Sequence, residues 1–149
     1  MCFLRYLANR YGSAPYWPPD LEARTQIDKW AEWSKINVAL NFTGPIVWRV
    51  VHTAPQDRDE AAIERAIGIL GNKRDIAETQ LGCHAYLAGD KFTFADIQFG
   101  HLSYRYFDIA IDRPERPVRQ RYCDRLTERP EFSEHVMVSH EGIEGKVTQ

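Results

Sequence analysis

The stretch GDKFTFADIQFG, residues 89–100, constrains the fold of this chain most strongly because it specifies where one helix begins. Thr93 and Asp96 have the spacing of a capping box, in which each side chain bonds the backbone amide of the other residue. Phe92 and Ile97 stand at the two positions of a hydrophobic staple. An apolar run follows, and a buried helix end must satisfy its free N–H groups inside the protein. We therefore predict a structural capping box at Thr93 and Asp96, and no catalytic role for Asp96.

Apolar spacing predicts helices along most of the remaining chain. Asp20 is the expected N-cap of a long helix that Pro45 bends. Asp57 and Glu60 form an Asp-x-x-Glu start for a second long helix, and Gly82 is its expected stop. No segment alternates for long as a strand does. The sequence predicts an all-α fold, a helical bundle of five to six helices. The predicted helices cover residues 3–11, 20–52, 57–81, 93–113, 117–127 and 130–137.

Length and composition indicate one domain with its own core, since the chain has 149 residues of which 44% are hydrophobic. The net charge of -2 argues against a protein that binds nucleic acid. Acidic residues interleave with the arginines of the C-terminal third, which we interpret as a solvated, ion-paired face. These arginines are Arg113, Arg116, Arg119, Arg121, Arg125 and Arg129.

Cysteine usage and the absence of long apolar runs predict a cytoplasmic protein that does not enter the membrane. The three cysteines, Cys2, Cys83 and Cys123, lack the spacing of a metal site or a disulfide framework. Neither Cys83 nor Cys123 stands at an expected helix N-terminus, which would lower a thiol pKa, so both are expected to be inert buried thiols. The histidines lack metal-ligand spacing as well. We predict no metal site and no catalytic residue in this chain.

Several segments carry a resemblance to one protein family. YLAGDKFTFADI, residues 86–97, resembles the signature of the C-terminal domain of bacterial cytosolic glutathione S-transferases, in which such a box opens the central helix of the bundle. RYLANRYG, residues 5–12, resembles the last helix of that family's thioredoxin-like domain. YWPPDLEARTQIDKWAEW, residues 16–33, resembles the linker and the first long helix, and RLTERPEF, residues 125–132, resembles the final helices. The four matches occur in the family's order.

The resemblance implies a division of the chain into three parts. Residues 1–12 would be a remnant of the last helix of a thioredoxin-like domain, 13–19 the linker, and 20–149 the all-helical C-terminal domain. The thioredoxin-like domain, which supplies the glutathione site and the thiol-activating residue in that family, is then largely missing. The chain would be a fragment, a truncated gene product or a free-standing module.

The function implied is that of the substrate-side and dimerisation domain of a glutathione S-transferase. The full-length form would conjugate glutathione, its co-substrate, to hydrophobic electrophiles. The chain alone should be inactive and bind no cofactor. We expect a homodimer, in which the missing thioredoxin-like domain or another partner covers the first long helix. The alternative is a non-catalytic interaction and assembly module of the same fold.

A polar stripe along the first long helix is the expected ligand wall. Ser34, Asn37 and Asn41 form the stripe, and Trp33 lies beside it. In the resembling enzymes this helix faces the substrate cleft, which implies substrate-binding roles for Trp33, Asn37 and Asn41. Alternatively, these side chains line a dimer contact or a wet groove.

Four further residues complete the predicted site. Tyr104 and Phe107 would line the same cleft, although aromatic residues at this spacing also suit the core. Arg24 and Asp28 are possible glutathione contacts that reach across a dimer. His101 is expected to be a hydrogen-bonded core residue.

Overall fold

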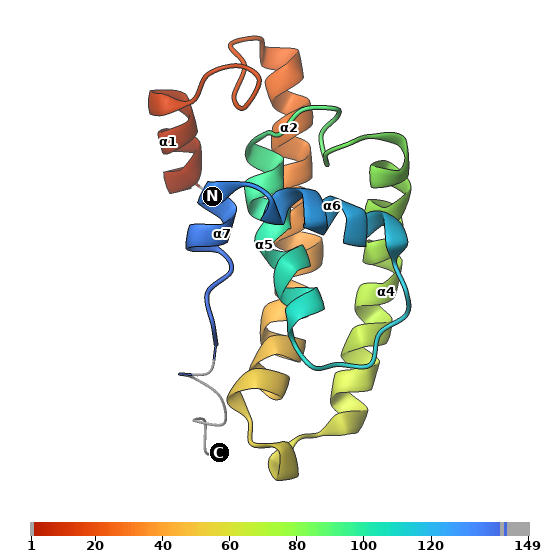
Figure 1. Cartoon of the computed structure of the whole chain (residues 1–149). Coiled ribbons are helices and arrows are strands. Elements are labelled where there is room, and N and C mark those ends of the chain that lie inside the picture. Colours follow the sequence, from red (N-terminus) through yellow and green to blue (C-terminus); the bar gives the residue numbers. More distant parts are fainter. Residues whose placement is uncertain (1, 141, 143–149) are drawn as a thin grey trace.

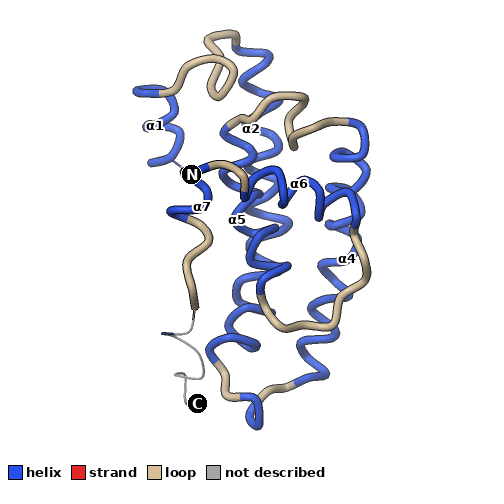
Figure 2. The backbone as a smooth tube through the Cα atoms, viewed as in Figure 1, coloured by secondary structure: helices blue, strands red, loops and turns tan. Residues whose placement is uncertain are grey.

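The computed structural model describes residues 2–140 and 142 (Figure 1). In this part of the chain the backbone forms helices and loops without a strand (Figure 2), apart from one isolated bridge between Tyr86 and Gly89. The all-α prediction is confirmed. The elements are α1 Cys2–Tyr11, α2 Leu21–Trp33, η1 Ser34–Ala39, α3 Leu40–Phe42, η2 Thr43–His52, η3 Pro55–Asp57, α4 Glu60–Cys83, α5 Phe94–Asp108, α6 Pro117–Thr127 and α7 Pro130–His135.

The first long helix is one continuous rod that changes its winding. Asp20 caps it as predicted, since its carboxylate accepts the Ala23 amide at 2.8 Å. The backbone widens to π-helical over η1 and η2. Pro45 lies in η2, has no N–H and would clash with the Asn41 carbonyl in a regular α-helix. The predicted disturbance near Gly44 therefore takes the form of a wider helix, with Phe42 at φ -111 just before it.

The second long helix, α4, begins two residues later than its sequence motif predicts. Asp59 is the N-cap, and its carboxylate accepts the Ala62 amide at 2.9 Å. Asp57 instead belongs to the 3-10 turn that Pro55 starts. At the other end the helix continues to Cys83, so Gly82 is not the residue that ends it. The later start has a local cause, because Asp57 belongs to the 3-10 turn and the Asp59 carboxylate meets the free amide.

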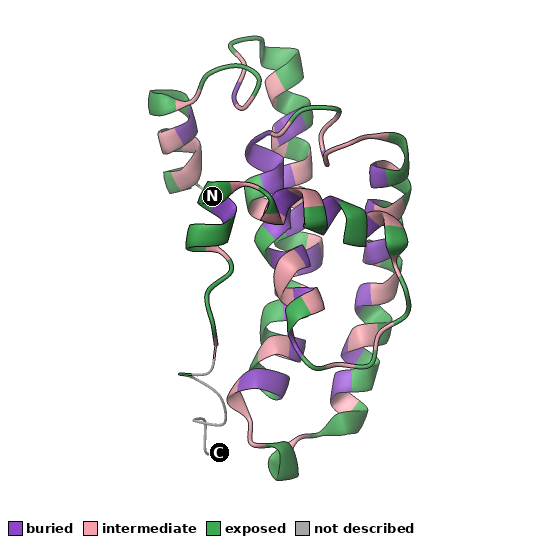
Figure 3. Ribbon diagram, viewed as in Figure 1, coloured by how far each residue is buried: buried purple, intermediate pink, exposed green. Residues whose placement is uncertain are grey.

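Helix α5 is the central element of the bundle. It packs against α2 and η1 on one side and against α6 on another, while α4 packs on η2 and α6. Buried residues, purple in Figure 3, follow α5 and the sides of α2 and α4 that face it. Gly100 allows the close approach of α6 and α7, since a Cβ there would lie 2.6 Å from Leu126 Cδ1 and 3.2 Å from Phe132 Cε2.

The capping box at the start of α5 is confirmed and is part of a larger network. Asp96 is fully buried, and its Oδ2 accepts the Thr93 backbone amide at 2.8 Å and the Thr93 hydroxyl at 3.1 Å. Its Oδ1 accepts the Leu87 amide at 2.9 Å and the Tyr122 hydroxyl at 3.0 Å. Burial raises the pKa of Asp96, while these four hydrogen bonds act in the opposite direction. Ile97, the expected staple residue, is 42% exposed.

Several arginines of the C-terminal third are not on a solvated face, so that interpretation is wrong for them. Arg119 is only 2% exposed, and its guanidinium lies 5.7, 5.1 and 5.6 Å from the ring centres of Phe99, Tyr106 and Phe107. Its Nε and Nη1 have no hydrogen-bond partner. Burial, together with the nearby charge of Arg74, lowers the pKa of Arg119 to about 10. The sequence pattern of alternating charges cannot show that this residue points inward.

The remaining arginines of this group mostly hold the ends of other elements. Arg116 pairs with Asp75 of α4, and Arg125 donates to the Ala85 carbonyl at 2.8 Å. Arg129 lies 4.1 Å from the centre of the Phe92 ring. These arginines connect α6 and the residues after it to α4 and to the loop before α5.

Helix α1 is attached to α2 mainly by ion pairs. Arg5 donates from Nε to Asp28 at 2.8 Å and also bonds Glu32. Ala8 and Trp17 are buried, and the Trp17 indole donates to Asn9 at 3.0 Å. The described part of the predicted segment 1–12 is therefore helical, and Met1 lies outside the described residues. So do residues 141 and 143–149 of the predicted domain 20–149.

Replacing Asp96 with alanine should lower the free energy of unfolding by about 2–4 kcal/mol, because it removes four hydrogen bonds and leaves buried amides unpaired. Denaturant unfolding of both proteins measures this change. Asp59→Ala is the matched control, since it removes an exposed cap and should cost about 1 kcal/mol. Equal losses for the two variants would contradict a special role for Asp96.

Replacing Arg119 with methionine should leave the stability within about 1 kcal/mol of the parent or raise it, because a buried charge without a full set of partners loses its hydration. Thermal unfolding tests this, with the exposed Arg121→Met as the control. A large loss of stability in Arg119→Met alone would mean that the three aromatic rings more than compensate the buried charge.

Candidate functional site

A cleft of about 520 Å³ lies between η2, α5 and the segment that follows α7. Its walls are mostly apolar, and the polar groups are one hydroxyl, two imidazoles and one guanidinium. The residues that define it are Thr43 and Val47 from η2, His101 and Arg105 from α5, and Val136 and Val138 from the C-terminal segment. Both the size and the mixture of surfaces are typical of small-molecule sites.

Arg105 holds the C-terminal wall of the cleft in place. Its Nη2 donates to the Val138 carbonyl at 3.2 Å, and its Nη1 donates to Asp108 at 2.5 Å. His140 Nδ1 lies 3.1 Å from Arg105 Nη1 and 3.3 Å from the Asp108 carboxylate. The segment after α7 is therefore fastened to the C-terminal end of α5.

His101 presents a neutral imidazole to the cleft. Its Nδ1 lies 3.1 Å from the Ile97 carbonyl, an interaction in which the ring nitrogen must donate. Partial desolvation of the ring lowers the pKa of His101, and the nearby charge of Arg105 acts in the same direction. In the neutral ring Nε2 is then a hydrogen-bond acceptor. The ring is hydrogen-bonded as expected, but it is exposed rather than part of the core.

The phenols and thiols whose pKa is shifted are not activated for ionisation. Burial raises the pKa of Tyr16, Tyr104 and Tyr122, and it raises that of the Cys123 thiol to about 11. These groups remain protonated at neutral pH. Cys123 is buried as predicted, whereas Cys83 is exposed, because it is the last residue of α4.

The predicted ligand wall does not line this cleft. Trp33 is half-buried, and its ring lies 5.3 Å from that of Trp30 and 5.9 Å from that of Phe99. The Asn41 side chain donates to the Asn37 carbonyl at 2.9 Å, one turn back along the same helix. The structure therefore places these side chains in packing and local hydrogen bonds.

Tyr104 and Phe107 also belong to other contacts. The Tyr104 ring lies edge-on to Phe132 at 6.0 Å, and the Phe107 ring lies 5.4 Å from Tyr106. Phe107 additionally faces the guanidinium of Arg119. Both residues help to join α5 to the helices that follow it.

Arg24 and Asp28 are used to hold the N-terminal segments on α2. Arg24 donates twice to the Pro18 carbonyl, at 2.9 and 3.1 Å, and once to Asn9 at 3.3 Å. Asp28 accepts from Arg5. Both charged groups thus have partners inside the described part of the chain.

Thr43, Val47, His101 and Val138 were missed as site residues by the sequence reasoning. The pair TG before Pro45 is a weak signal for an irregular helix, and such irregularities often occur at functional sites. The return of the C-terminal segment onto α5 has no comparable signal in the sequence. Within the described residues, no cluster of three or more candidate metal ligands occurs. No helix there has both the length and the hydropathy to cross a membrane.

The fold and the cleft together define the helical C-terminal domain of glutathione S-transferases. The family model described as "Glutathione S-transferase, C-terminal domain" matches residues 38–130. The apo structure of the theta class glutathione S-transferase from Xanthomonas axonopodis pv. citri is 33% identical, with a TM-score of 0.87, over 93% of this chain and 73% of that chain. The same enzyme with glutathione bound aligns with a TM-score of 0.85.

Sequence relatives agree with the structural ones. Glutathione S-transferase GstB of Escherichia coli K12 is 30% identical over 135 residues, which cover 91% of this chain and 64% of that protein. The disulfide-bond oxidoreductase YghU of the same organism is 31% identical over 134 residues, covering 85% of this chain and 45% of YghU. The chain belongs to the glutathione S-transferase family and spans just under two thirds of GstB.

Proposed function

We propose that this chain supplies the substrate-side wall of a glutathione S-transferase that conjugates glutathione to hydrophobic electrophiles. The observation that carries the proposal is the apolar cleft between η2, α5 and the C-terminal segment. Family membership adds support, because relatives are glutathione S-transferases and one is solved with glutathione bound. Glutathione would be a co-substrate and not a resident cofactor.

The cleft residues would bind a ligand through apolar contacts and one hydrogen bond. Val47 and Val138 would cover the carbon skeleton of an electrophile, since apolar surface removed from water stabilises the bound state. Neutral His101 would accept a hydrogen bond from a ligand N–H or O–H group. Burial raises the pKa of the Cys123 thiol to about 11, so this thiol forms no thiolate at neutral pH. In this proposal the group that activates glutathione belongs to another part of the enzyme.

The residues expected from the sequence keep a secondary role in this proposal. Trp33, Asn37 and Asn41 would set the position of η2 from the preceding turns, and Tyr104 and Phe107 would fix α5. Arg24 and Asp28 would hold α1 against α2, which is the edge where we propose that the thioredoxin-like part joins. The division into residues 1–12, 13–19 and 20–149 is part of the same proposal.

The chain alone should bind the conjugate 1-(S-glutathionyl)-2,4-dinitrobenzene through its aromatic end and show no conjugating turnover. Methyl NMR would detect the binding as shifts at Val47 and Val138, with glutathione alone as the ligand control. Val47→Glu should abolish the shift at Val138, because a carboxylate replaces an apolar wall.

The control variant is Leu21→Glu, which places the same charge on an exposed position at the start of α2 and should leave binding unchanged. Robust conjugation of glutathione to 1-chloro-2,4-dinitrobenzene by the chain alone would contradict the proposal. So would conjugate binding that survives in Val47→Glu.

A homodimer is the second part of the proposed function. The long helices carry exposed apolar side chains in pairs, with Leu40 at 67% and Ile69 at 61% exposure, accompanied by Ile36 and Ile76. Members of a pair on one helix are four or seven residues apart and so share a face. Paired apolar residues on a surface favour a partner. The same observation favours the alternative of a non-catalytic assembly module, whose partner would be a different protein.

Light scattering should give twice the 17.3 kDa chain mass at micromolar concentration. The double variant Ile69→Glu and Ile76→Glu should shift the protein to monomer, since it places charges in the proposed contact. Arg121→Glu, an exposed change on α6, serves as the control. A parent protein that is monomeric throughout would favour the assembly module over the homodimer.

A further inference from the structure

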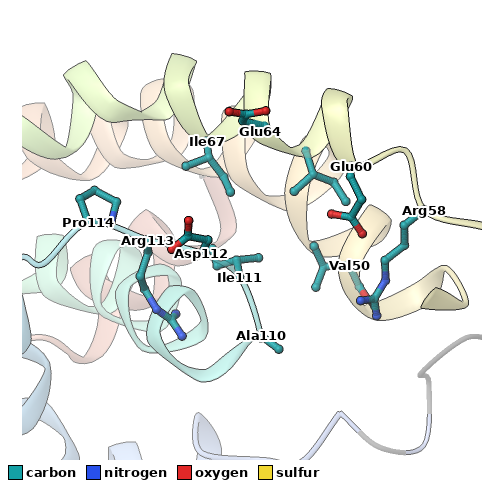
Figure 4. A pocket seen from close by; sticks show the side chains of 11 residues that line it. Val50, Arg58, Glu60, Glu64, Ile67, Ala110, Ile111, Asp112, Arg113 and Pro114 are labelled. Atoms are coloured by element: carbon teal, nitrogen blue, oxygen red, sulfur yellow. The ribbon is translucent and has the colours of Figure 1, made fainter. Parts of the chain in front are cut away.

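A second cavity, of about 670 Å³, lies apart from the cleft and shares none of its lining residues (Figure 4). It is a partly open groove between the first half of α4 and the extended segment 110–114 that connects α5 to α6. Val50 of η2 also lines it. Drug-sized ligands occupy volumes of this order.

The floor of the groove is apolar. Val50 and Ile63 are buried, and Ile67 and Ile111 are half-buried. Ile63 and Ile67 are four residues apart on α4, so they present one continuous surface to the groove. Ile111 faces that surface from the connecting segment (Figure 4). An apolar ligand body would lose contact with water along this floor.

The two arginines that line the groove donate hydrogen bonds to backbone carbonyls. Arg58 donates to Thr53 at 3.3 Å and also to the Val50 carbonyl, at the end of η2. Arg113 donates to Ile109 at 3.0 Å and also to the Tyr106 carbonyl, at the end of α5. Figure 4 shows the Arg113 guanidinium turned away from α4. Both guanidinium groups keep their positive charge, but each commits two of its nitrogens to carbonyls.

The rim of the groove also carries three exposed carboxylates. Glu60, Glu64 and Asp112 are exposed, and within residues 2–140 none of them forms an ion pair. Glu60 approaches the groove from α4 and Asp112 from the connecting segment (Figure 4). The rim thus combines unpaired negative charge on both sides with an apolar floor between them.

We propose that this groove binds a small amine with an apolar body. Aliphatic amines are ionised at neutral pH because their pKa is close to that of lysine, about 10.4. An ammonium group would lie between the rim carboxylates while its hydrocarbon part covers Ile63, Ile67 and Ile111. An anion of the same size would be disfavoured, because the three carboxylates of the lining outnumber its two guanidinium groups.

Decane-1,10-diamine is a suitable probe, because its two ammonium groups are separated by a hydrocarbon chain. Titration of protein labelled at the isoleucine methyl groups should give saturable shifts at Ile63, Ile67 and Ile111. Decane-1,10-diol is the uncharged control and decanedioate the anionic one. Both should bind more weakly than the diamine, and added salt should weaken only the diamine.

Variants of the rim test the charges separately from the floor. Asp112→Asn and Glu60→Gln should each weaken diamine binding by about two- to fivefold, the range expected for one exposed ion pair. Glu128→Gln, an exposed acid on another element, should leave it unchanged. Equal affinity for the diol and the diamine would overturn the proposal, as would shifts confined to Ile97 and the cleft. Binding unaffected by both rim variants would also refute it.

Discussion

The carboxylate of Asp96 is the interaction on which the rest of the structure depends. It is fully buried and joins three parts of the chain: the loop before α5 through Leu87, the start of α5 through Thr93, and α6 through Tyr122. A buried carboxylate without partners would be strongly destabilising, whereas four donors make it a fixed junction. Because the donors come from separate segments, they can satisfy it only when all of those segments are in place. The side chain therefore specifies an arrangement of helices and not merely the end of one helix.

The junction also determines where the cleft residues lie. His101 and Arg105 follow Asp96 by five and nine residues on α5, so the position of the helix start sets their height along the bundle. Gly100 lets α6 and α7 approach α5 closely, and the segment after α7 then lies within reach of Arg105. The cleft is formed where that segment and η2 stand on either side of α5. Its geometry thus follows from packing around the buried helix end.

The sequence predicts those parts of the fold that local chemistry decides. The capping box at Thr93, the Asp20 cap and the helix starts at Pro117 and Pro130 need only neighbouring residues. The site is harder, because it depends on distant segments and on helix winding. A π-helical turn contains more residues than an α-helical one, so Ser34, Asn37 and Asn41 do not continue the faces of α2. Buried Ser34 instead donates to the Trp30 carbonyl at 2.8 Å. The prediction that Arg119 lies on a solvated face was wrong for a similar reason. Alternating charges in a sequence do not distinguish an arginine on an exposed face from one buried among aromatic rings.

The two cavities differ in charge in a way that follows from where helices end. In the cleft, Arg105 is paired with Asp108, and desolvation together with the nearby charge of Arg105 lowers the pKa of the His101 imidazole. In the groove, the arginines Arg58 and Arg113 bind carbonyls at the ends of η2 and α5, and carboxylates are left unpaired around the floor. Carbonyl groups at a helix end carry partial negative charge, so they compete with carboxylates for nearby guanidinium groups. The same residue type is therefore paired with a carboxylate beside the cleft, whereas beside the groove it binds carbonyls and the rim carboxylates have no ion pair within residues 2–140.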